Sequence, residues 1–207
     1  MPGQALPLLG YAHGWSGIVT ALAARQRTTA DWDEAAMITS CLERAARFPS
    51  RLLAEHDQWR DYRFGLSKEP LNKSWCNGIP GILIGLAACR SWCGDRVSRF
   101  GEVLAAQTVQ TLGAGDIQRF CCGEMGNVDW CLDHAGTLAP GAATELRQRI
   151  AETAMRAVAA TRLADGPLVP ELAFPGLFHG RAGILYTALR SVVPTLPSLA
   201  GQDSLSV

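Results

Sequence analysis

The stretch His13-Gly14-Trp15-Ser16-Gly17-Ile18 shows a pattern that occurs four times in this chain of 207 residues. Two glycines stand with two residues between them, and an apolar run opens directly afterwards. The later copies are Asn77-Gly78-Ile79-Pro80-Gly81-Ile82, Cys122-Gly123-Glu124-Met125-Gly126-Asn127 and His179-Gly180-Arg181-Ala182-Gly183-Ile184. A recurring unit of this kind predicts an architecture built from repeated structural elements.

The residues after each glycine pair have the periodicity of helices. A lean run of small and apolar residues comes first, and a more polar amphipathic stretch follows it. We expect Asp33 to cap the second helix and Pro49 to end it. Helices are expected after Gly17 and over residues 34–48, 51–64, 81–93, 96–112, 127–135, 140–162 and 183–193. The sequence therefore predicts an all-α fold with an inner ring of lean helices, an outer ring of polar ones, and no strand of useful length.

The composition suits a globular domain and excludes some partners. Apolar residues make up 48% of the chain, and its 19 basic and 19 acidic side chains cancel. A nucleic-acid or anionic-membrane partner needs a basic excess that is absent here. No apolar run reaches the roughly 20 residues of a membrane span, and no secretory signal is visible. We expect a cytoplasmic protein whose seven cysteines are reduced thiols.

Three cysteines beside the glycine turns are the strongest chemical signal. Cys121 and Cys122 are adjacent and precede Gly123, and Cys76 stands two residues before Gly78. Three protein ligands with a fourth position open are typical of catalytic zinc. The residues alone leave two interpretations open, a metal site and a group of buried thiols.

Other reactive side chains are weaker candidates. Cys41, Cys89, Cys93 and Cys131 fall in expected helices, where cysteine is usually a small buried hydrophobe. His13 and His179 each precede a repeat glycine; imidazole suits proton transfer near neutral pH, but either ring could instead hold its turn by hydrogen bonds.

Longer phrases around these residues resemble the lanthionine synthetase C family. They are Tyr11-Ala12-His13-Gly14-Trp15-Ser16-Gly17-Ile18, Ser74-Trp75-Cys76-Asn77-Gly78-Ile79-Pro80-Gly81-Ile82, Cys121-Cys122-Gly123 and Leu177-Phe178-His179-Gly180-Arg181-Ala182-Gly183-Ile184. The stretch Pro194-Thr195-Leu196-Pro197-Ser198-Leu199 is similar to the end of class II lanthipeptide synthetases. The resemblance implies an α/α toroid, of which this chain would form a part.

The resemblance also implies the site and its chemistry. Cys76, Cys121 and Cys122 would bind Zn²⁺, with Cys122 in place of the family's more usual histidine, and His13 would be the catalytic acid or base. The implied function is a zinc-dependent cyclase of lanthipeptide biosynthesis, which adds peptide cysteine thiols to dehydroalanine or dehydrobutyrine and so forms lanthionine thioethers. Its substrate would be a precursor peptide.

Two departures from the family pattern shape the domain prediction. The family has more repeats than the four found here, and Asn72 and Lys73 stand where an arginine is often present. We therefore expect residues 1–207 to be the C-terminal portion of a cyclase domain, truncated at its N-terminus. Its partners would include the remaining N-terminal repeats or a dehydratase domain.

Two alternatives remain at the level of sequence. The first is a catalytically inactive, zinc-stabilised α-toroid fragment that binds a peptide or a thiol. The second is a carbohydrate-active enzyme, which needs two carboxylates flanking a cleft; Glu124 and Asp129 are the candidates for that pair.

Overall fold

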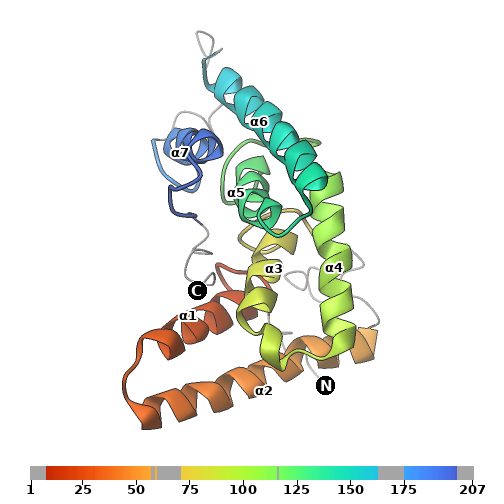
Figure 1. Ribbon diagram of the computed structural model, residues 1–207, viewed down its shortest axis with the longest axis vertical. Coiled ribbons are helices and arrows are strands. Elements are labelled where there is room, and N and C mark those ends of the chain that lie inside the picture. Colours follow the sequence, from red (N-terminus) through yellow and green to blue (C-terminus); the bar gives the residue numbers. More distant parts are fainter. Residues whose placement is uncertain (1–7, 57–58, 60–70, 116, 163–174, 200–207) are drawn as a thin grey trace, which may run out of the picture. The chain divides into compact units, whose positions relative to one another are not determined.

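A computed structural model describes residues 8–56, 59, 71–115, 117–162 and 175–199 (Figure 1). Every regular element in these residues is helical, and no strand occurs among them, so the all-α prediction is confirmed. The elements are α1 (Trp15–Thr28), α2 (Trp32–His56), α3 (Ile79–Ala88), the short 3₁₀ helix η2 (Arg90–Trp92), α4 (Asp95–Gln110), α5 (Glu124–Ala135), α6 (Pro140–Arg162) and α7 (Arg181–Val192).

The four glycine phrases all form the same structure. Each of the helices α1, α3, α5 and α7 begins directly after the first glycine of a phrase, a few residues earlier than expected. In three phrases the first helical residue donates its N–H to a carbonyl seven residues earlier. These bonds are Trp15 to Leu8 (2.8 Å), Ile79 to Asn72 (2.9 Å) and Glu124 to Ile117 (2.9 Å). The sequence repeat is therefore a structural repeat.

Close backbone approach explains why the first position of the phrase is glycine. A Cβ atom on Gly14 would lie 2.3 Å from the Leu8 carbonyl oxygen, the same atom that accepts the Trp15 N–H. On Gly78 the distance to the corresponding oxygen of Asn72 would be 2.0 Å. Such separations lie well inside van der Waals contact, so any larger residue must open the turn.

Helix α2 differs from its prediction at both ends. Its N-cap is Asp31 rather than Asp33, because Asp31 Oδ1 accepts the N–H groups of Asp33 (2.9 Å) and Glu34 (3.2 Å). The helix also runs through Pro49, the residue expected to end it, as far as His56. Proline has no N–H to donate to the carbonyl four residues earlier, here that of Ala45. The Trp15 indole donates to that carbonyl at 2.8 Å and satisfies it instead.

The other bounds agree with the sequence to different degrees. Helix α6 spans residues 140–162 as predicted. The expected helix 81–93 is instead α3 followed by the separate turn η2. Gly113 follows the end of α4 with a φ of 82°, which is the left-handed conformation that glycine tolerates best. The expected helix over 51–64 coincides with the end of α2, and most of its remainder lies outside the described residues.

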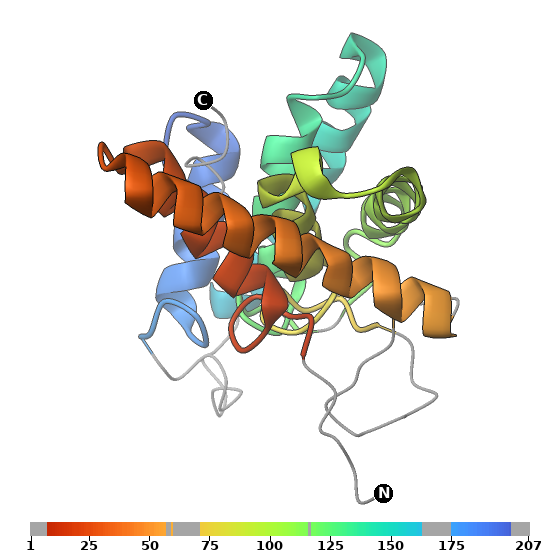
Figure 2. The same cartoon turned by 90° about the horizontal axis from the view of Figure 1, so that it is seen from below.

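The chain divides into two compact units, one of residues 1–72 and 76–105 and one of residues 73–75 and 106–207. In the first, α1 packs against α3 and α2, and both views show α1 lying along α2 (Figures 1 and 2). In the second, α5 packs against α7, and α6 packs against both of them. Within each unit the glycine-turn helices therefore pair with one another. The polar helix α2 packs against α1 in the first unit, and α6 packs against both α5 and α7 in the second.

Two glycine-turn helices carry exposed apolar side chains. On α7 these include Leu185, Leu189 and Val192, and on α1 the side chain of Ile18 is 61% exposed. Among the described helices, none is long and apolar enough to cross a lipid bilayer.

Candidate metal centre

Equivalent residues of neighbouring glycine turns are joined by main-chain hydrogen bonds. Ala12 and Cys76 each stand two residues before the first glycine of a phrase, and the Ala12 N–H donates to the Cys76 carbonyl at 3.0 Å. Cys121 and Phe178 hold the same position in the next two phrases, and the Cys121 N–H donates to the Phe178 carbonyl at 2.9 Å. Hydrogen bonds between equivalent residues of two phrases thus fix the main chain at Cys76 and at Cys121.

An aromatic cluster in the second unit lies beside the cysteines in sequence. The Trp75 ring stacks on Phe178 with 5.4 Å between centroids, and its centroid is also 5.4 Å from that of Phe120. A Cβ on Gly126 would lie only 2.8 Å from the Cβ of Trp75, so the backbone of α5 approaches this residue closely. Trp75 directly precedes Cys76, and Phe120 directly precedes Cys121. The packed rings therefore anchor the peptide bonds that lead into both thiols.

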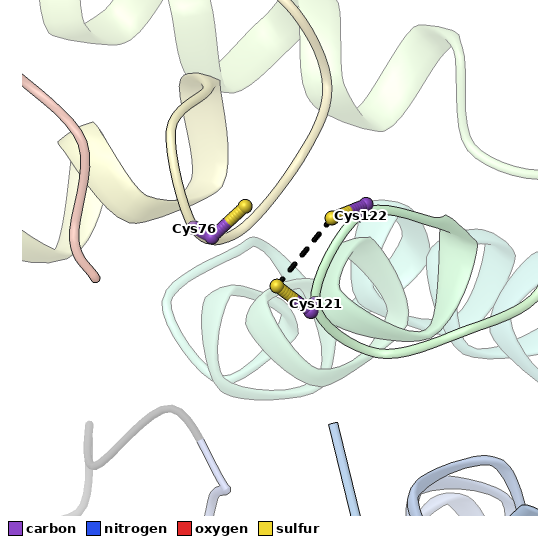
Figure 3. A group of neighbouring side chains, drawn as sticks. All are labelled: Cys76, Cys121 and Cys122. Atoms are coloured by element: carbon purple, nitrogen blue, oxygen red, sulfur yellow. Dashed lines mark hydrogen bonds between the residues drawn. The ribbon is translucent and has the colours of Figure 1, made fainter. Parts of the chain in front are cut away.

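The three predicted ligands lie together. The Sγ atoms of Cys121 and Cys122 are 3.4 Å apart, and the Sγ atoms of Cys76, Cys121 and Cys122 all lie within 4.8 Å of one another (Figure 3). Cys76 and Cys121 are buried, whereas Cys122 is exposed. The Asn77 amide also approaches Cys76 Sγ, at 3.5 Å. The group therefore has a buried side and a side open to solvent.

This donor set fits a soft divalent metal ion. Zn–S bonds of about 2.3 Å in a tetrahedral site place sulfur atoms about 3.8 Å apart, close to the 3.4 Å between the Sγ atoms of Cys121 and Cys122. Cys122 also lies one residue before the N-cap of α5, where the partial positive charge of the helix end favours a thiolate. Three thiols are one ligand fewer than a closed tetrahedral zinc site requires.

Both candidate histidines are exposed, and they hold equivalent positions in their phrases. His13 and His179 directly precede the first glycine of their phrases, as Asn77 and Cys122 do, and both side chains face solvent. His13 follows Ala12, whose N–H binds the Cys76 carbonyl, and His179 follows Phe178, whose carbonyl binds the Cys121 N–H. The repeat thus places each imidazole directly after a main-chain contact with a cysteine-bearing turn.

The comparison with known families supports the resemblance seen in the sequence. The family description "Lanthionine synthetase C-like protein" matches residues 4–200, which is nearly the whole chain. The chain belongs to this family. No curated protein sequence matches it. The all-α fold and the pairing of lean with polar helices agree with the α/α toroid expected for a member of the lanthionine synthetase C-like family.

The remaining cysteines of this family member follow the core prediction only in part. Cys89 and Cys131 are fully buried, and burial raises the pKa of the Cys131 thiol to about 12, so it stays protonated. Cys93 is half-buried, and its Sγ lies 3.3 Å from that of Cys89. Cys41 is exposed on α2, and the prediction of a buried thiol there was wrong.

The two carboxylates considered for glycoside hydrolysis have structural partners instead. Glu124 is buried and accepts the Gly113 N–H at 3.0 Å. Asp129 is also buried and pairs with Arg190 at 3.0 Å, while its second oxygen accepts the Ser198 hydroxyl at 2.6 Å. A glycosidase needs two carboxylates that reach a sugar from opposite sides of a cleft, and these two hold the fold together.

Sequence reasoning missed two contributors to these arrangements. Arg190 is 3% exposed and ties α7 to α5 through Asp129 and Asp133, yet an arginine near a helix end looks like a surface residue in sequence. Phe178 provides both the ring that stacks on Trp75 and the carbonyl that binds the Cys121 N–H. Its place two residues before Gly180, equivalent to Cys76 and Cys121, was the available signal.

Proposed function

We propose that this protein is a zinc-dependent thioether cyclase, or a part of one, that acts on a precursor peptide of lanthipeptide biosynthesis. The reaction joins a cysteine thiol to a dehydroalanine or dehydrobutyrine in the same peptide. The observation that carries the proposal is the group of three thiols with one exposed member, in a chain of the lanthionine synthetase C-like family.

Cys76, Cys121 and Cys122 are the proposed zinc ligands. These residues would hold the ion, whose chemistry when bound would be to lower the pKa of a substrate thiol and keep that thiol ionised. Three thiolates would donate more negative charge to the metal than the two thiolates and one imidazole that are more usual in the family. Cys122 is exposed, so a peptide thiol could reach the group from solvent.

His13 is the proposed proton donor. The sulfur of the substrate thiolate adds to the β-carbon of the dehydrated residue, and the electron pair of the double bond moves to the α-carbon. That carbon must then take a proton. An exposed imidazole beside the Cys76 turn suits this role near neutral pH. His179 holds the equivalent place beside the Cys121 turn and is the second candidate.

The proposed partner is a further set of glycine-turn repeats, in the same or another chain. Val19, Leu83 and Val128 stand five residues after the first glycine of their phrases and are buried, whereas the equivalent Leu185 on α7 is 49% exposed. One position earlier, Ile82, Asn127 and Ile184 are buried and only Ile18 of α1 is exposed. We therefore infer that α1 and α7 each leave one apolar flank for another repeat.

The same open flanks favour the second candidate function, a zinc-stabilised fragment that binds a peptide or thiol without turnover. The two proposals differ in one result. A cyclase forms thioether once the further repeats are supplied, whereas a binding fragment retains zinc and binds peptide but forms no thioether under any such condition.

The first test measures the metal. We expect one zinc per chain in the parent protein and loss of that zinc in Cys121→Ala, because two thiolates remain of three. Cys41→Ala is the matched control, since its thiol is exposed and outside the group. Elemental analysis of the purified proteins provides the readout, and an undiminished zinc content in Cys121→Ala contradicts the ligand assignment.

The second test measures turnover in the assembly that contains the further repeats. We expect His13→Ala to retain zinc and to form thioether about 10²–10⁴-fold more slowly, the usual loss for a removed general acid. Mass spectrometry after blocking of free thiols counts the rings formed. A parent-like rate in His13→Ala assigns the proton transfer to another group.

A further inference from the structure

A second pair of thiols lies away from the glycine turns. Cys89 follows the last residue of α3, and Cys93 follows the 3₁₀ turn η2, four residues later. Their Sγ atoms are 3.3 Å apart, and both residues belong to the first compact unit. Neither has a place in the cyclase chemistry proposed above.

The two thiols differ in access and in acidity. Cys89 is fully buried, whereas Cys93 is half-buried in a connection whose residues Arg90, Ser91 and Gly94 are exposed. The hydrogen bond between the thiols lowers the pKa of Cys93, and the same bond together with burial raises that of Cys89. Cys93 is therefore the thiol that ionises and meets solvent first, and Cys89 stays protonated beside it.

We propose that Cys89 and Cys93 form a reversible dithiol–disulfide site whose oxidant is a low-molecular-weight disulfide of the glutathione type. Two exchange steps make the bond. The Cys93 thiolate attacks the disulfide, forms a mixed disulfide on Cys93 and releases one glutathione thiolate. The Cys89 sulfur then attacks Cys93 Sγ, the second glutathione leaves as a thiolate, and this thiolate takes up the proton that Cys89 gives up.

The local backbone allows the bond to close. A disulfide has its sulfur atoms about 2.05 Å apart, so the thiols must approach by roughly 1.3 Å. Cys93 has an extended backbone after a single 3₁₀ turn, and its N–H bond to the Arg90 carbonyl is long at 3.3 Å. A small rotation in this turn brings the sulfurs together without breaking α3 or α4. Because α2 contacts η2, the disulfide stiffens a connection that three helices share.

The test uses the full chain, purified with zinc and equilibrated at increasing ratios of oxidised to reduced glutathione. Free thiols are then blocked by alkylation. Trypsin cuts after Arg90, so the disulfide joins peptides 74–90 and 91–96, and fragmentation of the joined pair distinguishes Cys89 from Cys76 in the first peptide. We expect the Cys89–Cys93 disulfide to reach half-occupancy at a ratio about tenfold below that at which Cys41 acquires glutathione, because the second exchange is intramolecular.

Two variants test the order of attack. Cys89→Ser should hold glutathione as a stable mixed disulfide on Cys93, and Cys93→Ser should leave Cys89 unmodified. If Cys89→Ser fails to fold because that residue is buried, Cys93→Ser still provides a test, since Cys93 is only half-buried. Thiols that stay reduced while Cys41 is modified, or a mixed disulfide on Cys93 that persists in the parent protein, overturn the proposal. Neither outcome depends on zinc content or cyclase activity.

Discussion

At the scale of single residues, the glycine turns of this protein depend on the absence of a Cβ atom. In three of the phrases the first glycine lies against a carbonyl six residues earlier, and that carbonyl also accepts the first helical N–H. A turn that is both this tight and hydrogen-bonded has no room for a Cβ. The start of the lean helix in each of these three phrases therefore depends on glycine, which has a hydrogen atom in place of the Cβ.

Gly14→Ala tests this dependence. A Cβ placed 2.3 Å from the Leu8 oxygen must displace the turn, so we expect the free energy of unfolding to fall by about 1–3 kcal/mol. The matched control is Gly141→Ala, which lies in α6 with nothing within 4 Å of the new atom. That change should stabilise the protein by about 0.5–1 kcal/mol, because alanine favours a helix over glycine. Urea unfolding measures both; equal effects of the two variants would contradict the close-approach argument.

At the scale of elements, the long helix α2 shows how one tertiary contact overrides a local signal. Pro49 removes the N–H that should bind the Ala45 carbonyl, and the Trp15 indole of α1 takes its place. Trp15 directly follows Gly14, so the glycine turn that starts α1 also presents the donor that α2 needs. The two helices are therefore coupled by a hydrogen bond as well as by packing.

A double-mutant cycle measures that coupling. Trp15→Phe removes the indole donor and leaves the Ala45 carbonyl without it, whereas Pro49→Ala supplies a helical N–H to the same carbonyl. We expect Trp15→Phe to cost about 1 kcal/mol less in the Pro49→Ala background than in the parent, the typical worth of one buried hydrogen bond. Urea unfolding of the four proteins provides the cycle. An identical cost in both backgrounds shows that Trp15 acts by packing alone.

At the scale of the whole molecule, the burial pattern of the four repeats is asymmetric. Ile18 of α1 and Leu185 of α7 are exposed, whereas the equivalent positions of the other glycine-turn helices are buried. Contiguous exposed apolar surface favours association, because burying it removes that surface from water. The proposal of further repeats as partners follows from this asymmetry.

Leu185→Lys tests the open flank of α7. We expect the isolated chain to self-associate at high concentration, and the substitution to shift it toward monomer, because a buried lysine in the interface costs desolvation energy. Met155→Lys is the matched control, since Met155 is 66% exposed and lies on the polar helix α6 rather than on a glycine-turn helix. Sedimentation velocity distinguishes the states. A parent chain that stays monomeric throughout argues against an unfilled flank.

The sequence by itself determined the features that depend on short-range geometry. The glycine spacing predicts the four helix starts, and at three of them only glycine fits beside the carbonyl six residues earlier. The apolar stripe of residues 140–162 predicts α6 with its correct bounds, because helix periodicity is a local property. The cysteines beside the repeat glycines identified the three thiols that the structure groups, because equivalent positions of a repeat are presented in the same way.

Only the tertiary structure decided the features that depend on distant partners. Pro49 stays within α2 because Trp15 reaches Ala45, and Glu124 and Asp129 are structural because Gly113 and Arg190 occupy their oxygens. In each case the deciding hydrogen bond or contact depends on the packed chain, which local pattern and residue type do not specify.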